Sequence, residues 1–158
     1  MSVITRLDHG HAHCLMCGHR NPRSLRLRFQ SDSDGRVSAS FQAFSELQGY
    51  EGILHGGIVV GLLDAAMTHC LFNQGIRAVT GDLRARFLQP IGCQCLLHLQ
   101  AWPLTLEGPV YRVRAELRHR NRVMAWAKAS FMRGSVNELG AAQVRGEGNH
   151  EKGGDHHL

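Results

Sequence analysis

Aromatic residues are scarce in this 158-residue chain, at 6% of its composition, and no run rich in lysine and arginine has aromatic side chains interleaved with it. The formal charge of +5 favours polyanionic partners in general: nucleic acid, an acidic membrane surface or a phosphorylated ligand. Because nucleic-acid-binding domains usually combine a basic run with aromatic side chains, we expect no nucleic-acid partner.

The first nine residues, Met1 to His9, lack the apolar core of an export signal. The chain has five cysteines, an odd number that does not favour a complete set of disulfides. Cysteines of a chain without an export signal usually remain reduced in the cytosol. We therefore expect a cytoplasmic protein with free thiols.

A second pair of cysteines with zinc-site spacing is also missing. Cys14 and Cys17 have the spacing of half a zinc site. The other half would have to come from nearby histidines, or from Cys93 and Cys95, which are too close together for a standard zinc knuckle. One such pair is a weak signal, and the alternative is a loop that ends in a turn at Asn21-Pro22. We therefore expect no metal and no cofactor.

Long apolar runs are absent with one exception, the nineteen residues from Leu54 to Phe72. A run of this length could just span a membrane, but His55, Asp64 and His69 interrupt it and strand-like segments flank it. Its apolar residues go all the way round a helix instead of forming one stripe. We therefore expect a buried central helix that ends near Gly75, and no membrane partner.

The remaining segments alternate apolar and polar residues with period two, which is typical of half-buried strands. Along 79–87 the alternation places Leu83 on one face and Thr80 with Arg84 on the other. The expected strands are 25–29 and 37–41 before the helix, and 79–87, 95–102, 111–119 and 123–132 after it. Such a series predicts an α+β fold, in which an antiparallel sheet of about six strands wraps one long central helix.

The length of the chain suits one folded domain with flanking segments. Residues 1–24 form a lead-in that contains Cys14 and Cys17, and residues 25–133 form the folded domain. Residues 134–158 are rich in glycine, histidine and polar residues and have almost no apolar content, so we expect a disordered tail.

The segment Gln48-Gly-Tyr-Glu-Gly-Ile-Leu-His55-Gly56-Gly57, followed by Asp64, resembles the signature of hotdog-fold acyl-CoA thioesterases of the phenylacetate-pathway type. The opening Cys14-x-x-Cys17-Gly-x-x-Asn-Pro-x-x-Leu-x-Leu-x-Phe29 is similar to the lead-in of one branch of these proteins. The resemblance implies hydrolysis of an acyl-CoA to a carboxylic acid and free CoA. It also implies a homodimer or homotetramer with sites at subunit interfaces, and no cofactor beyond the CoA of the substrate.

The residues themselves fit this chemistry. A helix that starts at Gly56 and Gly57 presents unpaired N–H groups, which can form an oxyanion hole for a thioester carbonyl. Asp64, an acid inside an apolar helix, is either satisfied by a neighbouring polar group or acts as general base or nucleophile. His55, at the helix start, is expected to position the loop or the thioester.

Gly56 and Asp64 are eight residues apart, which corresponds to about 12 Å along a helix. An aspartate side chain cannot close that gap along its own helix, whereas reacting groups must approach within about 3.5 Å. We therefore expect two antiparallel helices from two subunits to form composite sites.

Two hydroxyls could assist Asp64. Thr80, which begins the first strand after the helix, matches a Ser/Thr of one branch of the family, and Thr68 lies one helical turn after Asp64. We favour Thr80, because Thr68 can bond back to the Asp64 carbonyl. Many relatives carry an Asn or Gln where this chain has Gly49, and the adjacent Gln48 is a possible substitute.

Arg84 and Arg86 are tentative contacts for the CoA phosphates, and a solvated outer sheet face is an equally good explanation of both. Two other functions stay open. One is an acyl-CoA-binding hotdog module without catalysis, suggested by the missing amide at Gly49. The other is a hotdog hydratase or dehydratase that would pair Asp64 with His55.

Overall fold

The computed structural model describes residues 10–134. Apart from Gly134, the expected tail over 134–158 lies outside the described residues, as does the start of the lead-in. The elements, in chain order, are strands β1 (Gln30–Ser31) and β2 (Val37–Gln42), the 3₁₀ helix η1 (Ser45–Leu47), helix α1 (Gly56–Asn73), and strands β3 (Ala78–Phe87), β4 (Leu96–Thr105), β5 (Val110–His119) and β6 (Arg122–Arg133).

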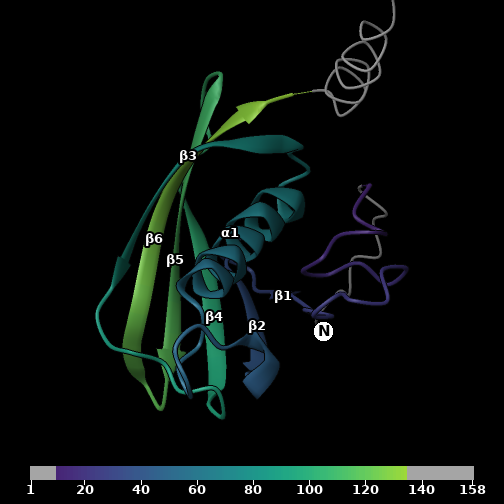
Figure 1. Cartoon of the computed structure of the whole chain (residues 1–158). Coiled ribbons are helices and arrows are strands. Elements are labelled where there is room, and N and C mark those ends of the chain that lie inside the picture. Colours follow the sequence, from purple (N-terminus) through teal and green to yellow (C-terminus); the bar gives the residue numbers. More distant parts are fainter. Residues whose placement is uncertain (1–9, 135–158) are drawn as a thin grey trace, which may run out of the picture.

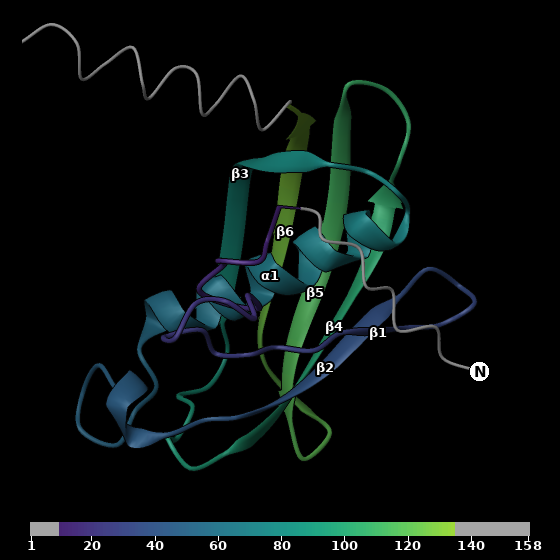
Figure 2. The same cartoon turned by 90° about the vertical axis from the view of Figure 1, so that its right-hand side faces the viewer.

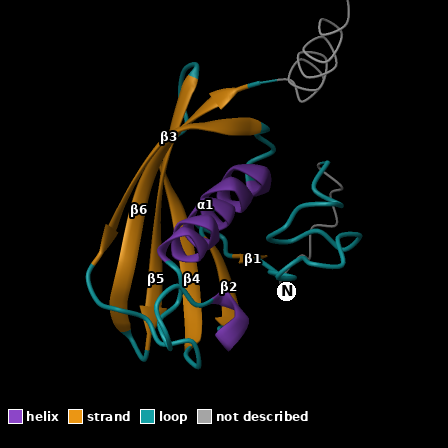
Figure 3. Ribbon diagram, in the orientation of Figure 1, coloured by secondary structure: helices purple, strands orange, loops and turns teal. Residues whose placement is uncertain are grey.

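One six-stranded antiparallel sheet curves around α1, which crosses its concave face (Figures 1 and 3). The strand order is β1-β2-β4-β5-β6-β3. The expected α+β fold of about six strands around one helix is therefore confirmed. The four strands after the helix do not all pair in chain order, because β3 bonds to β6 and occupies one edge of the sheet.

Helix α1 is buried against the sheet along most of its length. The side chains of Leu62, Leu63 and Met67 are fully buried, and they lie in one core with Leu97 and Phe131 of the sheet. Burying each side chain of this size contributes about 1.5–3 kcal/mol. By length and composition α1 could cross a membrane, but such a helix is also typical of a protein core, and α1 occupies that position here.

The end of α1 follows the sequence prediction. Gly75 has φ +71°, a left-handed conformation that is easy for glycine, and its N–H bonds to the Phe72 carbonyl at 2.9 Å. Residues 1–9 aside, the lead-in then lies on the side of α1 that faces away from the sheet (Figure 2). The helix is thus covered on two sides.

The expected strand over 25–29 is wrong, although its apolar residues do face inward. Arg26 has φ +58°, which interrupts an extended strand, and only Gln30–Ser31 pair with β2. The backbone N–H groups of Leu25 and Leu27 bond instead to the carbonyls of Leu15 and Met16, at 2.8 and 2.9 Å. This segment therefore fastens the lead-in to the domain.

The expected alternation along β3 is also wrong at one position. The pairing of β3 with β6 shifts between Thr80 and Asp82, so Gly81 is the extra residue of a β-bulge. Thr80 pairs with Phe131, whose side chain is fully buried, and therefore points to the helix side of the sheet together with Leu83. Strict alternation had placed Thr80 on the opposite face.

Candidate active site

His55 caps the N-terminus of α1. Its backbone is extended, with φ −60° and ψ 132°, and its Nδ1 accepts a 2.8 Å hydrogen bond from the Gly57 N–H. The acceptor role leaves Nδ1 without a proton. Within residues 10–134, no hydrogen bond uses the Gly56 N–H. Of the two glycine N–H groups that the sequence interpretation considered, only that of Gly56 is therefore free, because the Gly57 N–H bonds to the His55 side chain.

A cavity of about 710 Å³ opens at this end of the helix. Its walls are mostly apolar and come from the loop before α1, the first turn of α1, and the end of β3 with the loop that follows. The lining residues are Gly49, Tyr50, Ile53, Leu54, His55, Gly56, Val59, Phe87, Leu88, Gln89, Pro90 and Ile91. An apolar cavity that meets one free N–H group suits an acyl chain ending in a polarised carbonyl.

Asp64 lies in the middle of α1, half-buried, and its carboxylate is held by the edge strand. Thr80 Oγ1 donates a 2.7 Å hydrogen bond to Asp64 Oδ1. Of the two candidate hydroxyls, this is the one that contacts the acid, because Thr68 makes no side-chain hydrogen bond among the described residues. Oδ1 is therefore fixed, and Oδ2 stays available for chemistry.

The free N–H group and the acid do not meet within one chain. Asp64 is absent from the cavity lining, and the helical rise from Gly56 to Asp64 is about 12 Å. Both groups nevertheless lie along β3, since Phe87 faces Gly56 at one end of the strand and Thr80 bonds Asp64 near the other. Asp64 also belongs to no group of three metal-ligating side chains within the described residues.

Gln48 does not reach the free N–H group. Its Oε1 accepts a 3.0 Å hydrogen bond from the Gly52 N–H, which ties it to the turn before the helix. Gly49 lines the cavity, and a Cβ there would lie 3.3 Å from Cδ2 of His55. The cavity wall therefore has no amide side chain at position 49.

Arg84 and Arg86 are not brought to the site. In β3 they pair with Lys128 and Trp126 of β6, so they share the sheet face opposite to α1. Both arginines are exposed to solvent on that outer face, and neither lines the cavity.

The sequence interpretation missed the apolar wall of the cavity. Phe87, Leu88 and Tyr50 are 52%, 45% and 88% exposed, which is unusual for large apolar side chains grouped around one opening. Their signal in the sequence is weak, because an apolar pair at the end of a strand also fits an ordinary core. Only the fold shows that this strand end lies beside the first turn of α1.

The family model described as the thioesterase superfamily matches residues 51–125. Among curated proteins, acyl-coenzyme A thioesterase THEM4 of Rattus norvegicus is 32% identical over 80 residues, which cover 51% of this chain and 34% of the relative. The chain thus spans about a third of the length of that relative.

Two solved structures share the fold. A crystal structure of a thioesterase superfamily protein superposes with a TM-score of 0.73 at 22% identity, covering 77% of this chain and 60% of the other. The PaaI protein from the phenylacetic acid degradation operon of E. coli gives a TM-score of 0.66 at 18% identity, covering 72% and 83%. The expected resemblance to hotdog thioesterases is confirmed.

Proposed function

We propose that this chain belongs to the thioesterase superfamily and hydrolyses an acyl-CoA thioester to a carboxylic acid and free CoA. The main support for the proposal is that two groups lie along β3. One is the unpaired N–H of Gly56 at the apolar cavity, and the other is the carboxylate of Asp64, which Thr80 holds by a hydrogen bond. The name of the curated relative and the positive charge of this chain support CoA as the thiol.

The reaction needs a positive electrostatic environment at the carbonyl oxygen of the thioester and a negative group on the side from which the carbonyl carbon is attacked. As water or the carboxylate attacks the thioester carbonyl carbon, negative charge gathers on the carbonyl oxygen, where the Gly56 N–H and the positive end of α1 stabilise it. Asp64 uses its available Oδ2, either to take a proton from the attacking water or to attack directly. The carbon–sulfur bond then breaks. In the general-base route the CoA sulfur leaves with the proton that Asp64 took from water; after direct attack the thiolate takes a proton from solvent, and water then hydrolyses the mixed anhydride on Asp64 to release the acid.

We propose that two subunits assemble each site. Strand β3 is a ten-residue edge strand with one sheet partner, and Val79 and Phe87 on it are 37% and 52% exposed. A long, exposed edge strand is well suited to pair with a second copy of itself. In antiparallel pairing centred on Arg84, with Gly81 as the bulge residue, Thr80 of one subunit lies opposite Phe87 of the other, so Asp64 approaches the partner's Gly56.

A second function, acyl-CoA binding without turnover, is favoured by one observation. Gly49 has no side chain to hold the thioester or a water molecule, and the neighbouring Gln48 is bonded to Gly52. A site without an amide side chain at position 49 could bind an acyl chain in the cavity and leave the thioester intact.

Release of free thiol from a panel of acyl-CoA esters separates the two functions. The panel includes a phenylacetyl ester and a medium-chain ester, and Asp64→Asn is measured beside the parent. General acid–base steps contribute about 10²- to 10⁴-fold, so we expect a loss of that size in Asp64→Asn. Asp82→Asn is the matched control, because Asp82 lies on the opposite face of β3. Binding without turnover in both parent and control would support the binding module instead.

A further inference from the structure

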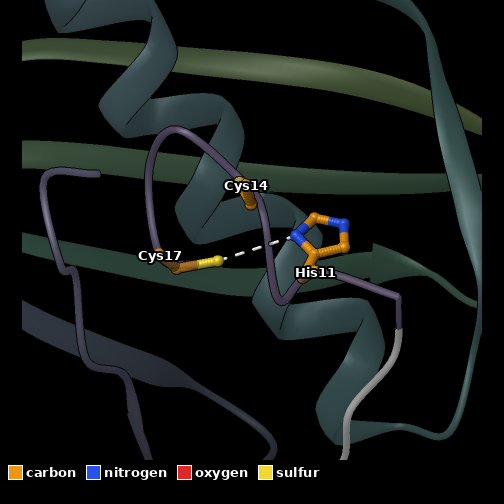
Figure 4. A group of neighbouring side chains, drawn as sticks. All are labelled: His11, Cys14 and Cys17. Atoms are coloured by element: carbon orange, nitrogen blue, oxygen red, sulfur yellow. Dashed lines mark hydrogen bonds between the residues drawn. The ribbon is translucent and has the colours of Figure 1, made fainter. Parts of the chain in front are cut away.

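The lead-in brings three metal-ligating side chains together on the side of α1 that faces away from the sheet. His11, Cys14 and Cys17 follow one another at intervals of three residues, and one ligand atom from each lies within 4.8 Å of the others. Figure 4 shows the three side chains converging across one loop, with Cys17 Sγ 3.6 Å from His11 Nδ1. Within residues 10–134 this is the one group of at least three such side chains.

The spacing is close to that of a tetrahedral zinc site. Zinc binds sulfur at about 2.3 Å and nitrogen at about 2.0–2.1 Å, so tetrahedral ligands lie about 3.6 Å apart for a nitrogen–sulfur pair and about 3.8 Å apart for two sulfurs. The His11–Cys17 distance of 3.6 Å already has the first value. The widest separation in the group needs to close by about 1 Å, which side-chain rotation can supply.

Three hydrogen bonds of the loop involve Cys14, through its N–H, its carbonyl and its sulfur. The Cys14 N–H bonds to the His11 carbonyl at 3.0 Å, and the Gly18 N–H bonds to the Cys14 carbonyl at 2.8 Å. The Met16 N–H points at Cys14 Sγ, 3.3 Å away, where it would stabilise a thiolate. Gly18 is required, because a Cβ there would lie 2.6 Å from the carbonyl oxygens of Ala12 and Cys14.

The surroundings hold this loop and the His11 ring in place. The ring packs edge-on against Phe72 of α1, with centroids 4.8 Å apart. Met16 lies over Gly61 of α1, where any Cβ would collide with its terminal carbon. Backbone bonds from Leu25 and Leu27 fasten the other side of the loop. The three ligands are thus largely arranged before any ion arrives.

We propose that His11, Cys14 and Cys17 bind one zinc ion that fixes the lead-in to α1. Two thiols lose their protons on binding, a neutral imidazole supplies nitrogen, and a water molecule takes the fourth position. The two thiolate charges balance the charge of the ion, which suits a half-buried site. Sulfur and imidazole ligands favour zinc over magnesium or calcium.

This proposal revises the expectation of no metal, which rested on the lack of a second half-site. The third ligand is His11, three residues before the cysteine pair, and Cys93 and Cys95 take no part. The role is structural: the proposed hydrolysis at Asp64 uses no metal, so either proposal can fail without the other.

The test uses the full chain, purified under reducing conditions and loaded with Zn²⁺ or Co²⁺. We expect about one zinc per chain after extensive dialysis. The Co²⁺ form should show sulfur-to-cobalt charge-transfer absorption and the strong visible bands of tetrahedral cobalt. Histidines elsewhere in the chain cannot give the sulfur band, so weak binding by them does not imitate the result. Cys14→Ser and Cys17→Ser should lose both signals, whereas Cys95→Ser, the matched control, should keep them.

Removal of the zinc from the parent should lower its melting temperature by about 5 °C or more, because binding energy is linked to folding. Absence of the sulfur-to-cobalt bands from the reduced parent at excess Co²⁺ would overturn the proposal, and this measurement needs no variant to fold. Equal bands in parent and Cys14→Ser would overturn it as well. In either case the 3.6 Å contact between Cys17 and His11 is an ordinary hydrogen bond.

Discussion

Thr80 Oγ1 and Asp64 Oδ1 lie 2.7 Å apart although the two residues are sixteen positions apart in the chain, and their hydrogen bond joins the edge strand β3 to the middle of α1. The β-bulge at Gly81 makes this contact possible, since it turns Thr80 toward the helix. The bulge and the bond together fix one oxygen of the carboxylate, and no hydrogen bond within residues 10–134 uses the other.

Thr80→Val keeps the shape of the side chain and removes the hydroxyl. A hydrogen bond to a charged group contributes about 1.5–3 kcal/mol, so we expect kcat for thiol release to fall at least about tenfold. KM should change little, because Thr80 lies outside the cavity lining. Thr80→Ser, the matched control, should retain most of the activity. A valine variant with the parent's kcat would show that the hydroxyl does not serve the reaction.

Gly56→Pro removes the one N–H group that the proposed oxyanion hole uses. Proline is favoured at the first position of a helix, and the extended backbone of His55 is compatible with a following proline. A Cβ at Gly56 meets only Phe87, at an ordinary 3.6 Å. We therefore expect an unchanged melting temperature and a kcat lower by about 10²- to 10³-fold. Unchanged kcat would place the carbonyl elsewhere.

Burial raises the pKa of Cys70, on α1, to about 12, and the nearby negative charge of Asp32 adds to the shift. At pH 8 almost none of this thiol is ionised, and the thiolate is the reactive form. We expect iodoacetamide at pH 8 to modify the half-buried Cys95 at least about 100-fold faster than Cys70 in the folded protein. Peptide mass spectrometry measures both rates, and equal rates would contradict the burial of Cys70.

The same shift predicts how stability depends on alkaline pH. In the unfolded chain this thiol ionises near its ordinary value of 9.0, whereas in the folded chain it keeps its proton to about 12. The folded state therefore binds more protons in this interval, and the free energy of unfolding should decrease as pH rises above about 9. Urea unfolding of the parent and Cys70→Ala between pH 8 and 10 isolates the contribution of this thiol.

The sequence was sufficient to predict the helix and the sheet because both depend on local patterns. An all-round apolar run with a glycine at its end specifies a buried helix, and period-two alternation specifies half-buried strands. The prediction of a strand over 25–29 was wrong because Arg26 takes a left-handed backbone conformation, which the alternation of apolar and polar residues does not indicate. Alternation failed at Thr80 because a single-residue bulge leaves the composition of a strand unchanged.

The candidate site was predictable only in part. The positions of Gly56 and Asp64 follow from helical spacing, but the capture of the Gly57 N–H by His55 depends on a side-chain rotamer. The pairing of β3 with β6 is non-local, so the cavity wall at Phe87 could not be derived from neighbouring residues. The convergence of His11 on the cysteine pair likewise depends on a tight turn.

Mixing two inactive variants tests the composite site directly. If each site combines Gly56 of one subunit with Asp64 of the other, then Asp64→Asn and Gly56→Pro are each inactive alone. A mixed dimer, however, contains one site with both groups intact and one site that lacks both. Random exchange of equal amounts makes about half of the dimers mixed, with one active site in each. The mixture should therefore recover about a quarter of the parent's activity, by this symmetry argument.

The control for that experiment places both substitutions in one chain and mixes it with the parent in the same ratio. The mixed dimers of this control have two damaged sites, one lacking Gly56 and one lacking Asp64. Only parent dimers are then active, and the control mixture also keeps about a quarter of the parent's activity.

The decisive comparison is thus the activity of the two inactive variants before and after subunit exchange. Recovery from near zero requires groups from two chains, because neither variant carries a complete set. No recovery, with exchange verified by mass spectrometry of the intact dimers, would mean that each chain completes its own site, and that the distance of about 12 Å along α1 is closed within the monomer.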